Sequence, residues 1–368
     1  MMMESHKMRF LDLQGRRLST NTRAISAQKA STDNNRTEDV CCSKCTKAGM
    51  EWDKYKPSPV VKDYAAVSTQ NSKFRKYMED ECVALPKYQV FHGDPALNCF
   101  FGVYDGHGGG FCSKYAASNF HHRLAAVLNG KVGTSRQRES ELSNQSAPTS
   151  SSSTELSDAE NNQVLSGEDI ENGYAEAFAA LDQELEEFDE ASNSGSTAVT
   201  CLIRKSKDRT TFHVANVGDS RAILYSGGVT TRLSVDHKAT NEDEAKRIRD
   251  NNGIIFNKRV GGIISVTRAL GQIDEKEFII AQPYTTSHEV RDGDAFLVLA
   301  SDGISDVFKD EELTEYVLTR LNRGEKAITI CKRLLDEAKN LGAMDNMTVV
   351  LICLSGDPPQ RHRHDEEH

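Results

Sequence analysis

Six acidic residues have the position and the neighbours that metal chemistry would require. They stand at the ends of short apolar segments, and most have Gly or Asn beside them. Short apolar runs bounded by turn formers are typical of strands, and Gly and Asn permit tight turns that bring backbone oxygens together. The six residues are Glu79, Asp80, Asp105, Asp219, Asp302 and Asp345. We therefore expect an oxygen-rich cage at one sheet edge.

The donor types in these motifs favour one class of cation. Carboxylate and carbonyl oxygens without a Cys or His cluster select hard ions, so we expect Mg²⁺ or Mn²⁺ and disfavour zinc. A single acid beside glycine is typical of an ordinary turn, as at Asp292-Gly293. Asp105 differs, because it ends an apolar run and precedes Gly-His-Gly-Gly-Gly, which leaves His107 near the same edge.

The composition of the 368-residue chain argues against several protein classes. A net charge of -10 without concentrated Lys and Arg argues against nucleic-acid binding. No apolar run approaches the roughly 20 residues of a membrane span. The 9 cysteines are odd in number, which favours buried thiols and a cytoplasmic location, with the nucleus also open. The Arg-containing N-terminus weakly resembles a mitochondrial transit peptide, but Glu4 and Asp12 argue against one.

Polar tracts divide the chain. Residues 1–58 lack a hydrophobic period and are predicted to be a disordered leader, in which Cys41, Cys42 and Cys45 lack the fourth ligand of a zinc site. Residues 131–166, rich in Ser, Asn, Gln and Glu, are predicted to be a disordered insertion between two helices. The folded domain is expected over residues 59–356, followed by a polar tail at 357–368.

Hydrophobic periodicity predicts the elements that would position the acidic motifs. Strands are expected over residues 64–68, 82–85, 98–104, 196–203, 211–216, 222–225, 296–301 and 347–354. Helices are expected after residue 109, along the stripe from Tyr174 to Phe188, after the capping pair Thr240-Asn241, and over residues 310–321 and 327–341. Runs of strands with helices in pairs predict an α+β fold, a sandwich of antiparallel sheets faced by helices.

Several independent motifs, in one order between about Tyr64 and Leu354, resemble those of the metal-dependent protein phosphatases, the type 2C or PPM family. The motifs are Arg75 with Met78-Glu79-Asp80, Val103 to Gly109, Ser194 to Ala198, Val214 to Arg221, Asp236-His-Lys238, Thr267 to Gly271, Leu299 to Asp306, and Asp345-Asn-Met347. The resemblance implies a β-sandwich of two antiparallel sheets with a helix pair on each outer face. It also implies a flap-like segment over residues 238–264 beside the site.

The resemblance assigns a role to each matched position. Asp105 would bridge two metal ions, with the Gly106 carbonyl on the first and with Asp302 and Asp345 on the second. Glu79 and Asp80 would act mainly through water. Asp219, Asp302 and Asp306 would form a weaker third site, although Asp306 could instead be a helix-entry residue whose charge favours the positive end of the helix dipole.

The implied reaction is hydrolysis of phosphoserine and phosphothreonine in other proteins, with phosphorylated proteins as partners and a monomeric enzyme. A hydroxide bridging two Mg²⁺ or Mn²⁺ ions would attack phosphorus without a covalent intermediate. Arg75 would hold the phosphate, and His107, protonated near neutral pH, would be the general acid. Two alternatives are a pseudophosphatase that only binds phosphoproteins and a nucleotide hydrolase, which would lack its usual Gly-x4-Gly-Lys loop.

Overall fold

The computed structural model describes residues 60–144, 165–207 and 209–354, and the side chains of residues 133–144 are not described. The predicted leader, its three-cysteine cluster and the polar tail from 357 to 368 therefore lie outside the described residues, as does the middle of the predicted insertion.

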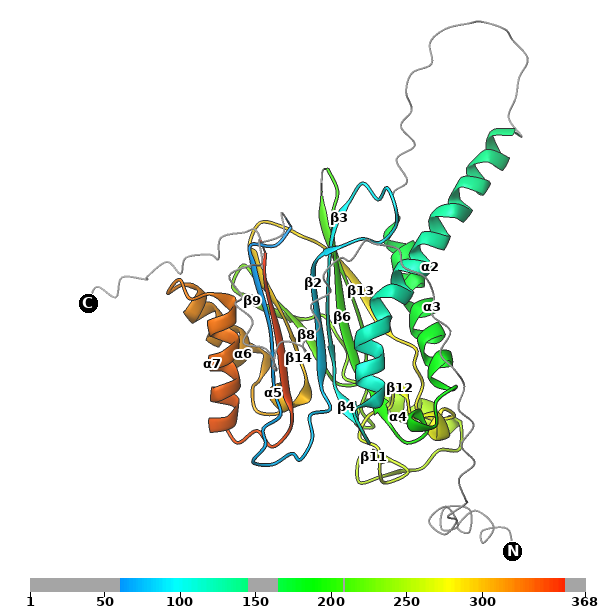
Figure 1. Cartoon of the computed structure of the whole chain (residues 1–368). Helices are drawn as coiled ribbons and strands as arrows, with labels where there is room; N and C mark the ends of the chain where they lie inside the picture. The colour runs from blue at the N-terminus through cyan, green and yellow to red at the C-terminus, as the bar shows by residue number, and fades with distance from the viewer. Residues whose placement is uncertain (1–59, 145–164, 208, 355–368) are drawn as a thin grey trace, which may run out of the picture. The chain divides into compact units, whose positions relative to one another are not determined.

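Two five-stranded antiparallel sheets form the centre of this domain. One sheet has the order β1-β15-β14-β8-β9 and the other β13-β7-β6-β3-β2. The first contains β1 (Asp63–Thr69), β15 (Met347–Cys353), β14 (Asp294–Ala300), β8 (Arg221–Ser226) and β9 (Val229–Arg232). The second contains β13 (Tyr284–Glu289), β7 (Thr210–Val217), β6 (Ala198–Lys205), β3 (Leu97–Tyr104) and β2 (Glu81–Tyr88). The sheets lie face to face between two groups of helices (Figure 1).

Four long helices cover the outer faces, as the sequence predicts. Figure 1 shows α2 and α3 on one side of the sandwich and α6 and α7 on the other. The helices are α2 (Phe111–Asn144), α3 (Gly167–Leu185), α6 (Asp310–Leu321) and α7 (Ala327–Asn340). Shorter elements are β4 (Gly106–His107), η3 (Asp189–Ala191), β5 (Gly195–Ser196), α4 (Glu242–Asp250), β10 (Ile255–Phe256), β11 (Arg259–Val260), β12 (Leu270–Gly271), η4 (Ile273–Glu275) and α5 (Asp302–Ser305). None of the helices within the described ranges is long and apolar enough to cross a membrane.

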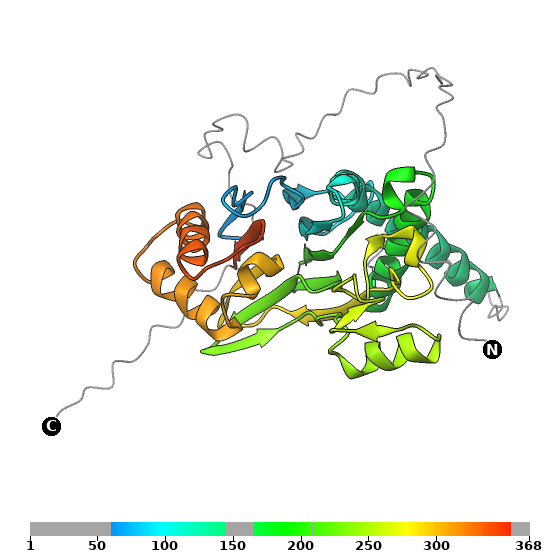
Figure 2. The ribbon, with the colours of Figure 1, turned by 90° about the horizontal axis from the view of Figure 1, so that it is seen from below.

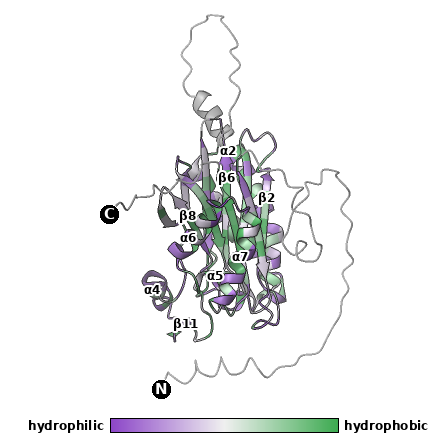
Figure 3. Ribbon diagram, turned by 90° about the vertical axis from the view of Figure 1, so that its left-hand side faces the viewer, coloured by the Kyte–Doolittle hydropathy of each residue, from purple (hydrophilic) through white to green (hydrophobic). Residues whose placement is uncertain are grey.

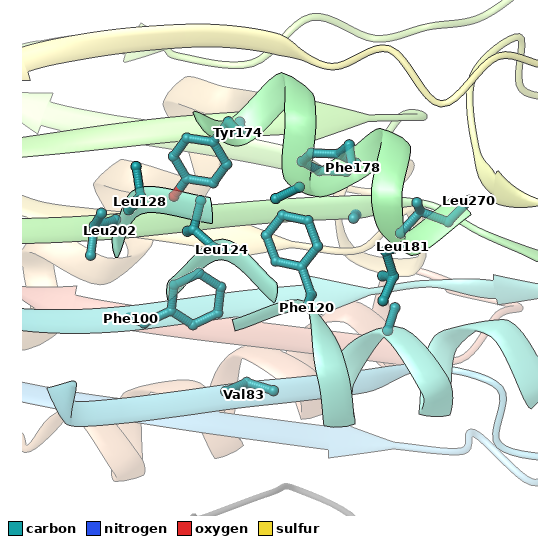
Figure 4. Packing of buried hydrophobic residues seen from close by; sticks show 14 of the residues in the cluster. Val83, Phe100, Phe120, Leu124, Leu128, Tyr174, Phe178, Leu181, Leu202 and Leu270 are labelled. Atoms are coloured by element: carbon teal, nitrogen blue, oxygen red, sulfur yellow. The ribbon is translucent and has the colours of Figure 1, made fainter. Parts of the chain in front are cut away.

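The burial pattern explains why these sequences pack as two sheets between two layers of helices. Side chains alternate along a strand, so Phe100 in β3 packs against the helices while Phe101 packs between the sheets. On the helix side, Phe120 of α2 lies against Phe178 of α3, with ring centroids 4.6 Å apart (Figure 4). Every residue of β14 and β15 is buried, which explains their nearly continuous apolar sequences. In Figure 3 the central strands are mostly hydrophobic, whereas helix α4 is mostly hydrophilic.

Helix ends differ from the predictions at two places. The backbone of α2 continues to Asn144, so the predicted insertion at 131–166 begins too early, and residues 131–144 are helical. The polar composition of these residues does not predict a helix, because the part of a helix that extends beyond the core needs no apolar stripe. Phe188 lies beyond the end of α3, yet it packs on Phe111 and Tyr115 at centroid distances of 5.3 and 5.2 Å.

The segment from 238 to 264 contains α4 and the β10-β11 hairpin, seen as the yellow-green helix and strands at one edge of Figure 2. The predicted cap is present, since the Asn241 side chain accepts hydrogen bonds from the amides of Asp243 and Glu244. The strand β13 was not predicted. It is half-exposed and lacks polar–apolar alternation, and only its pairing with β7 identifies it.

Candidate metal and phosphate site

Strand register brings the predicted acidic residues to one end of each sheet. In one sheet Glu81 pairs with Tyr104, so the residues just outside that pair, Asp80 and Asp105, are neighbours. In the other, Ala300 pairs with Val349, which places Asp302 and Asp345 beyond the same sheet end. Asp219 follows β7, whose last residue, Val217, pairs with Ala198 at the start of β6.

The two sheet ends meet at Asp80. Asp80 immediately precedes β2 of one sheet, but its carboxyl group lies at hydrogen-bonding distance from the side chains of Ser301, which follows β14, and Thr348, which lies in β15 of the other sheet. It is also hydrogen-bonded with Asp105 and experiences the charge of Asp345. Carboxylates from both sheets therefore form one cluster, which we call the carboxylate cluster: Asp80, Asp105, Asp219, Asp302 and Asp345.

The pKa values show how strongly this cluster resists carrying its full negative charge. Burial raises the pKa of Asp80 to about 6. Burial, followed by the charge of Asp80, raises the pKa of Asp105 well above its usual range. For Asp302 the pKa is also well raised, first by burial and then by the charges of Asp219 and Asp345. Bound cations would lower these pKa values, because their positive charge offsets the repulsion between the carboxylates and their coordination replaces the water that burial removes.

The donor set fits Mg²⁺ or Mn²⁺. All donors are oxygens, and among the described residues Oδ2 of Asp80 is buried without a hydrogen-bond partner. In that same part of the chain, no group of three or more Asp, Glu, His or Cys side chains is already placed so that it could hold a metal ion. Two cations of the protein approach the cluster instead: Lys238 Nζ lies 2.9 Å from Oδ2 of Asp219, and Arg75 forms an ion pair with Asp345.

Asp306 lies at the edge of the cluster, on the turn that Asp302 begins. The amide of Asp306 donates to the carbonyl of Asp302 at 2.8 Å, so the two residues occupy one helical turn, as the proposed third site requires. Lys238 Nζ is 3.9 Å from its carboxylate. The alternative role as a helix-entry residue is wrong, because Asp306 ends α5, and α6 begins at Asp310 with Lys309 as its N-cap.

Close backbone contacts fix Gly106 and Glu79. A Cβ atom on Gly106 would lie 2.5 Å from the carbonyl oxygen of Glu79, so only glycine allows this approach. The Glu79 amide donates to Asn346 Oδ1 at 2.8 Å, and the Glu79 carbonyl accepts from the hydroxyl of Ser113. The predicted ligand positions 79 and 106 therefore lie side by side, although they come from different strand connections.

Arg75 lies in the connection between β1 and β2, at the rim of the carboxylate cluster. Besides its ion pair with Asp345, its Nε donates to the carbonyl of Met344 at 3.4 Å. Buried Asn346 anchors the same connection, because its side-chain amide donates to the carbonyls of Gln70 and Tyr77. Asn346 belongs to the motif Asp345-Asn-Met347, but the sequence assigns no role to it, because its contacts with the Gln70 and Tyr77 carbonyls join segments that are distant in the chain.

His107 occupies β4 beside the cluster, with Nε2 buried and without a hydrogen-bond partner among the described residues. Burial lowers its pKa, while the charge of Asp219 and the Gln272 side chain act in the opposite direction. The position next to the cluster agrees with the prediction, but burial opposes the protonated form. Gln272 and Lys238 were not predicted as site residues, because their approach depends on the packing of distant loops.

Residues 64–347 match the family model described as Protein phosphatase 2C. A human protein named Protein phosphatase 1B is 32% identical over 276 residues, which cover 70% of this chain and 51% of the human protein. Protein phosphatase 2C homolog 1 of Saccharomyces cerevisiae is 28% identical over 313 residues, covering 81% of this chain and 95% of the yeast protein. The match therefore spans about half the length of the human relative and nearly all of the yeast one.

Solved structures show the same fold. A Caenorhabditis elegans sex determining protein aligns with a TM-score of 0.61 and 25% identity, covering 82% of this chain and 66% of that one. A serine-threonine phosphatase 2C from Toxoplasma gondii aligns with a TM-score of 0.61 and 20% identity, covering 82% of this chain and 96% of that one.

Proposed function

The chain belongs to the protein phosphatase 2C family, and we propose that it is a metal-dependent phosphatase that removes phosphate from serine and threonine residues of other proteins. The observation that carries this proposal is the carboxylate cluster, in which acids from both sheets converge with Arg75 at its rim. A cluster of raised carboxyl pKa values beside a guanidinium group is an arrangement suited to phosphoryl chemistry.

The proposed ligands use the residues that the fold brings together. The first ion would be held by Asp105 and the Gly106 carbonyl and the second by Asp105, Asp302 and Asp345, with Glu79 and Asp80 acting through water. Asp219, Asp302 and Asp306 would hold a weaker third ion. Bound Mg²⁺ or Mn²⁺ would supply Lewis acidity and lower the pKa of water for direct attack on phosphorus.

Arg75 would bind the substrate phosphate. Its guanidinium group already lies against a carboxylate of the cluster, so a phosphate that approaches the same carboxylates lies within its reach. The planar guanidinium can donate two parallel hydrogen bonds to phosphate oxygens. The residue is exposed, so the ion pair with Asp345 can exchange for a substrate without unpacking the core.

His107 would give a proton to the departing serine or threonine oxygen. Its pKa is lowered by burial, so the protonated form requires a nearby negative charge. A substrate phosphate bound at the cluster would add to the negative charge of Asp219, which already acts to raise the pKa of His107. The described cysteines are all buried and their positions offer no route to a covalent phosphocysteine, which supports direct hydrolysis.

The test is hydrolysis by the purified full chain in Mn²⁺ or Mg²⁺ and in EDTA. The substrates are p-nitrophenyl phosphate and phosphothreonine, phosphoserine and phosphotyrosine peptides. We expect metal-dependent turnover with preference for phosphothreonine and phosphoserine, and a loss of several orders of magnitude in Asp302→Asn. Binding of phosphopeptides without turnover would instead establish a pseudophosphatase, and full activity of Asp302→Asn at saturating metal would contradict the site.

A further inference from the structure

A basic and aromatic surface adjoins Arg75. It contains Lys73, Phe74, Lys76 and Tyr77 from the β1-β2 connection and Leu341 and Met344 from the connection between α7 and β15, and we call it the Arg75 surface. Its apolar side chains are unusually open, with 64% of Tyr77 and 67% of Met344 exposed, and with Phe74 and Leu341 also exposed. Large apolar groups gathered at one exposed place are typical of a binding surface.

Hydrogen bonds hold the two segments of this surface together. The Asn71 side chain donates to the carbonyl of Ala343 at 2.8 Å, and Asn346 donates to the carbonyl of Tyr77 at 3.0 Å. Arg75 adds its bond to the carbonyl of Met344. Figure 1 shows the blue β1-β2 connection beside the orange-to-red connection that precedes β15. The exposed side chains therefore project from a fixed backbone.

The charge of the Arg75 surface is opposite to that of the chain. Lys73 Nζ lies 4.9 Å from the ring centroid of Phe74, and Lys76 Nζ lies 5.3 Å from that of Tyr77. Both lysines are exposed, and their positive charges stand on a chain with a net charge of -10. Exposed ammonium groups above aromatic rings can bind acidic side chains while the rings cover apolar ones.

We propose that the Arg75 surface binds the polypeptide that flanks the phosphorylated residue of a substrate, and that it selects flanks with acidic side chains next to an apolar one. This inference rests on the proposed phosphatase function. A peptide whose phosphate lies at Arg75 must pass over neighbouring residues, and successive residues of an extended peptide advance by roughly 3.3 Å. Lys73 and Lys76 lie two and one positions from Arg75 in the sequence, within reach of the first flanking residues.

The test compares two charge-reversed double variants. Lys73→Glu/Lys76→Glu alters the Arg75 surface, and Lys87→Glu/Lys207→Glu is the matched control. Lys87 lies near the end of β2, and Lys207 follows β6, so both are exposed at the sheet end opposite to the site. Both variants change the net charge by the same amount, which separates a local contact from a long-range effect.

Each protein is assayed with phosphothreonine peptides whose flanks are either acidic with one leucine, or all alanine. We expect wild type to prefer the acidic peptide through a lower KM, and we expect Lys73→Glu/Lys76→Glu to reduce that preference by about five- to tenfold, since each exposed ion pair contributes modestly. The control variant should keep the wild-type preference. Phe74→Ser/Tyr77→Ser should lower the advantage of a leucine flank, and melting temperatures verify folding.

The outcomes separate the two proposals. Wild-type turnover of p-nitrophenyl phosphate without any flank preference would overturn the Arg75 surface and leave the phosphatase function standing. Equal loss of preference in the control variant would also overturn it, because long-range charge would then be sufficient. Absence of turnover on every substrate would overturn the phosphatase function, and the inference would fall with it.

Discussion

Two cations of the chain itself lie against the carboxylate cluster. Lys238 lies against Asp219, which is buried, and Arg75 lies against Asp345. Each pair partly compensates the negative charge of one carboxylate of the cluster. The residues that balance the site thus include one proposed phosphate ligand, Arg75, and one lysine with no assigned role in the reaction.

Replacing Lys238 should destabilise the metal-free protein more than the metal-loaded one. In Lys238→Met the buried Asp219 carboxylate loses its ammonium partner at 2.9 Å, which should lower the free energy of unfolding in EDTA by about 1 to 3 kcal/mol. Added Mn²⁺ should reduce this loss of stability, since a bound cation can neutralise Asp219 in place of Lys238. Unfolding in denaturant, with and without Mn²⁺, measures both values. Lys246→Met, at an exposed pair on α4, is the control, and an equal deficit in both conditions would contradict the compensating role.

Asp306 offers a direct test of the third cation. Asp306→Ala should slow turnover and raise the metal concentration needed for full activity, because it removes one ligand while the two tighter sites still fill. Its side chain is 63% exposed at the end of α5, so the fold should persist. Calorimetric titration should lose only a weak phase. Superimposable metal-activation curves for wild type and variant would exclude a catalytic third ion.

At the scale of elements, a buried carboxylate helps to fasten the flap-like segment to the domain, beside the apolar cluster of Ile248, Val260, Val266, Ala269 and Ile279. Glu244 of α4 accepts from the Thr267 hydroxyl at 2.8 Å and from Arg268 Nε at 3.0 Å, and Arg247 completes the group. The motif from Thr267 to Gly271 therefore has a structural role, because it binds α4 as well as entering β12. The surrounding hydrogen bonds and charges lower the pKa of Glu244 to about 2 against the opposing effect of burial.

The Glu244 group should stabilise the fold in a pH-dependent way. Its folded pKa, about 2, lies below the ordinary value of 4.5, so its contribution is complete above pH 4.5 and is lost as the pH falls toward 2. Glu244→Gln should lower the free energy of unfolding by about 3 kcal/mol at pH 7 and by less than half of that amount at pH 3. Denaturant unfolding at both values measures the difference. Glu242→Gln, exposed in the same helical turn, is the control; a deficit in Glu244→Gln that does not change with pH would indicate lost packing alone.

At the scale of the whole domain, the sandwich turns two separate sets of strand ends into one anionic site. Acids that precede β2 and follow β3 and β7 belong to one sheet, and acids that precede β15 and follow β14 belong to the other. The sheets pack through their apolar faces, which brings these negative charges close together. The apolar core stabilises the fold against the resulting repulsion between the carboxylates. The monomeric state and the cytoplasmic or nuclear location stay predictions.

Metal should therefore stabilise the whole domain. A cation bound only by the folded state adds roughly 2.7 kcal/mol at a concentration one hundred times its Kd. For a domain of this size we expect the melting temperature to rise by roughly 5 to 10 °C. A Mn²⁺ titration followed by calorimetry measures the rise, and Asp105→Asn should show a smaller one. A melting temperature that stays constant across the titration would contradict the cation site.

The local sequence determined the elements and the chemical type of the site. Period-two and period-3.6 patterns report which side chains are buried, so they predicted helix α6 with its observed bounds and α7 to within one residue of its end. Acids at the strand ends, without a Cys or His cluster, already indicated a hard cation. The family motifs then indicated which acids belong together.

Only the tertiary structure decided which distant segments complete the site. β1 pairs with β15 from the far end of the described chain, and β13 is a strand only because β7 lies beside it. Lys238 and Asn346 acquire their roles in the same way, through contacts with residues remote in sequence. Such contacts depend on the packing of both sheets at once. A local pattern records the burial of each segment, but it does not record the partner that buries it.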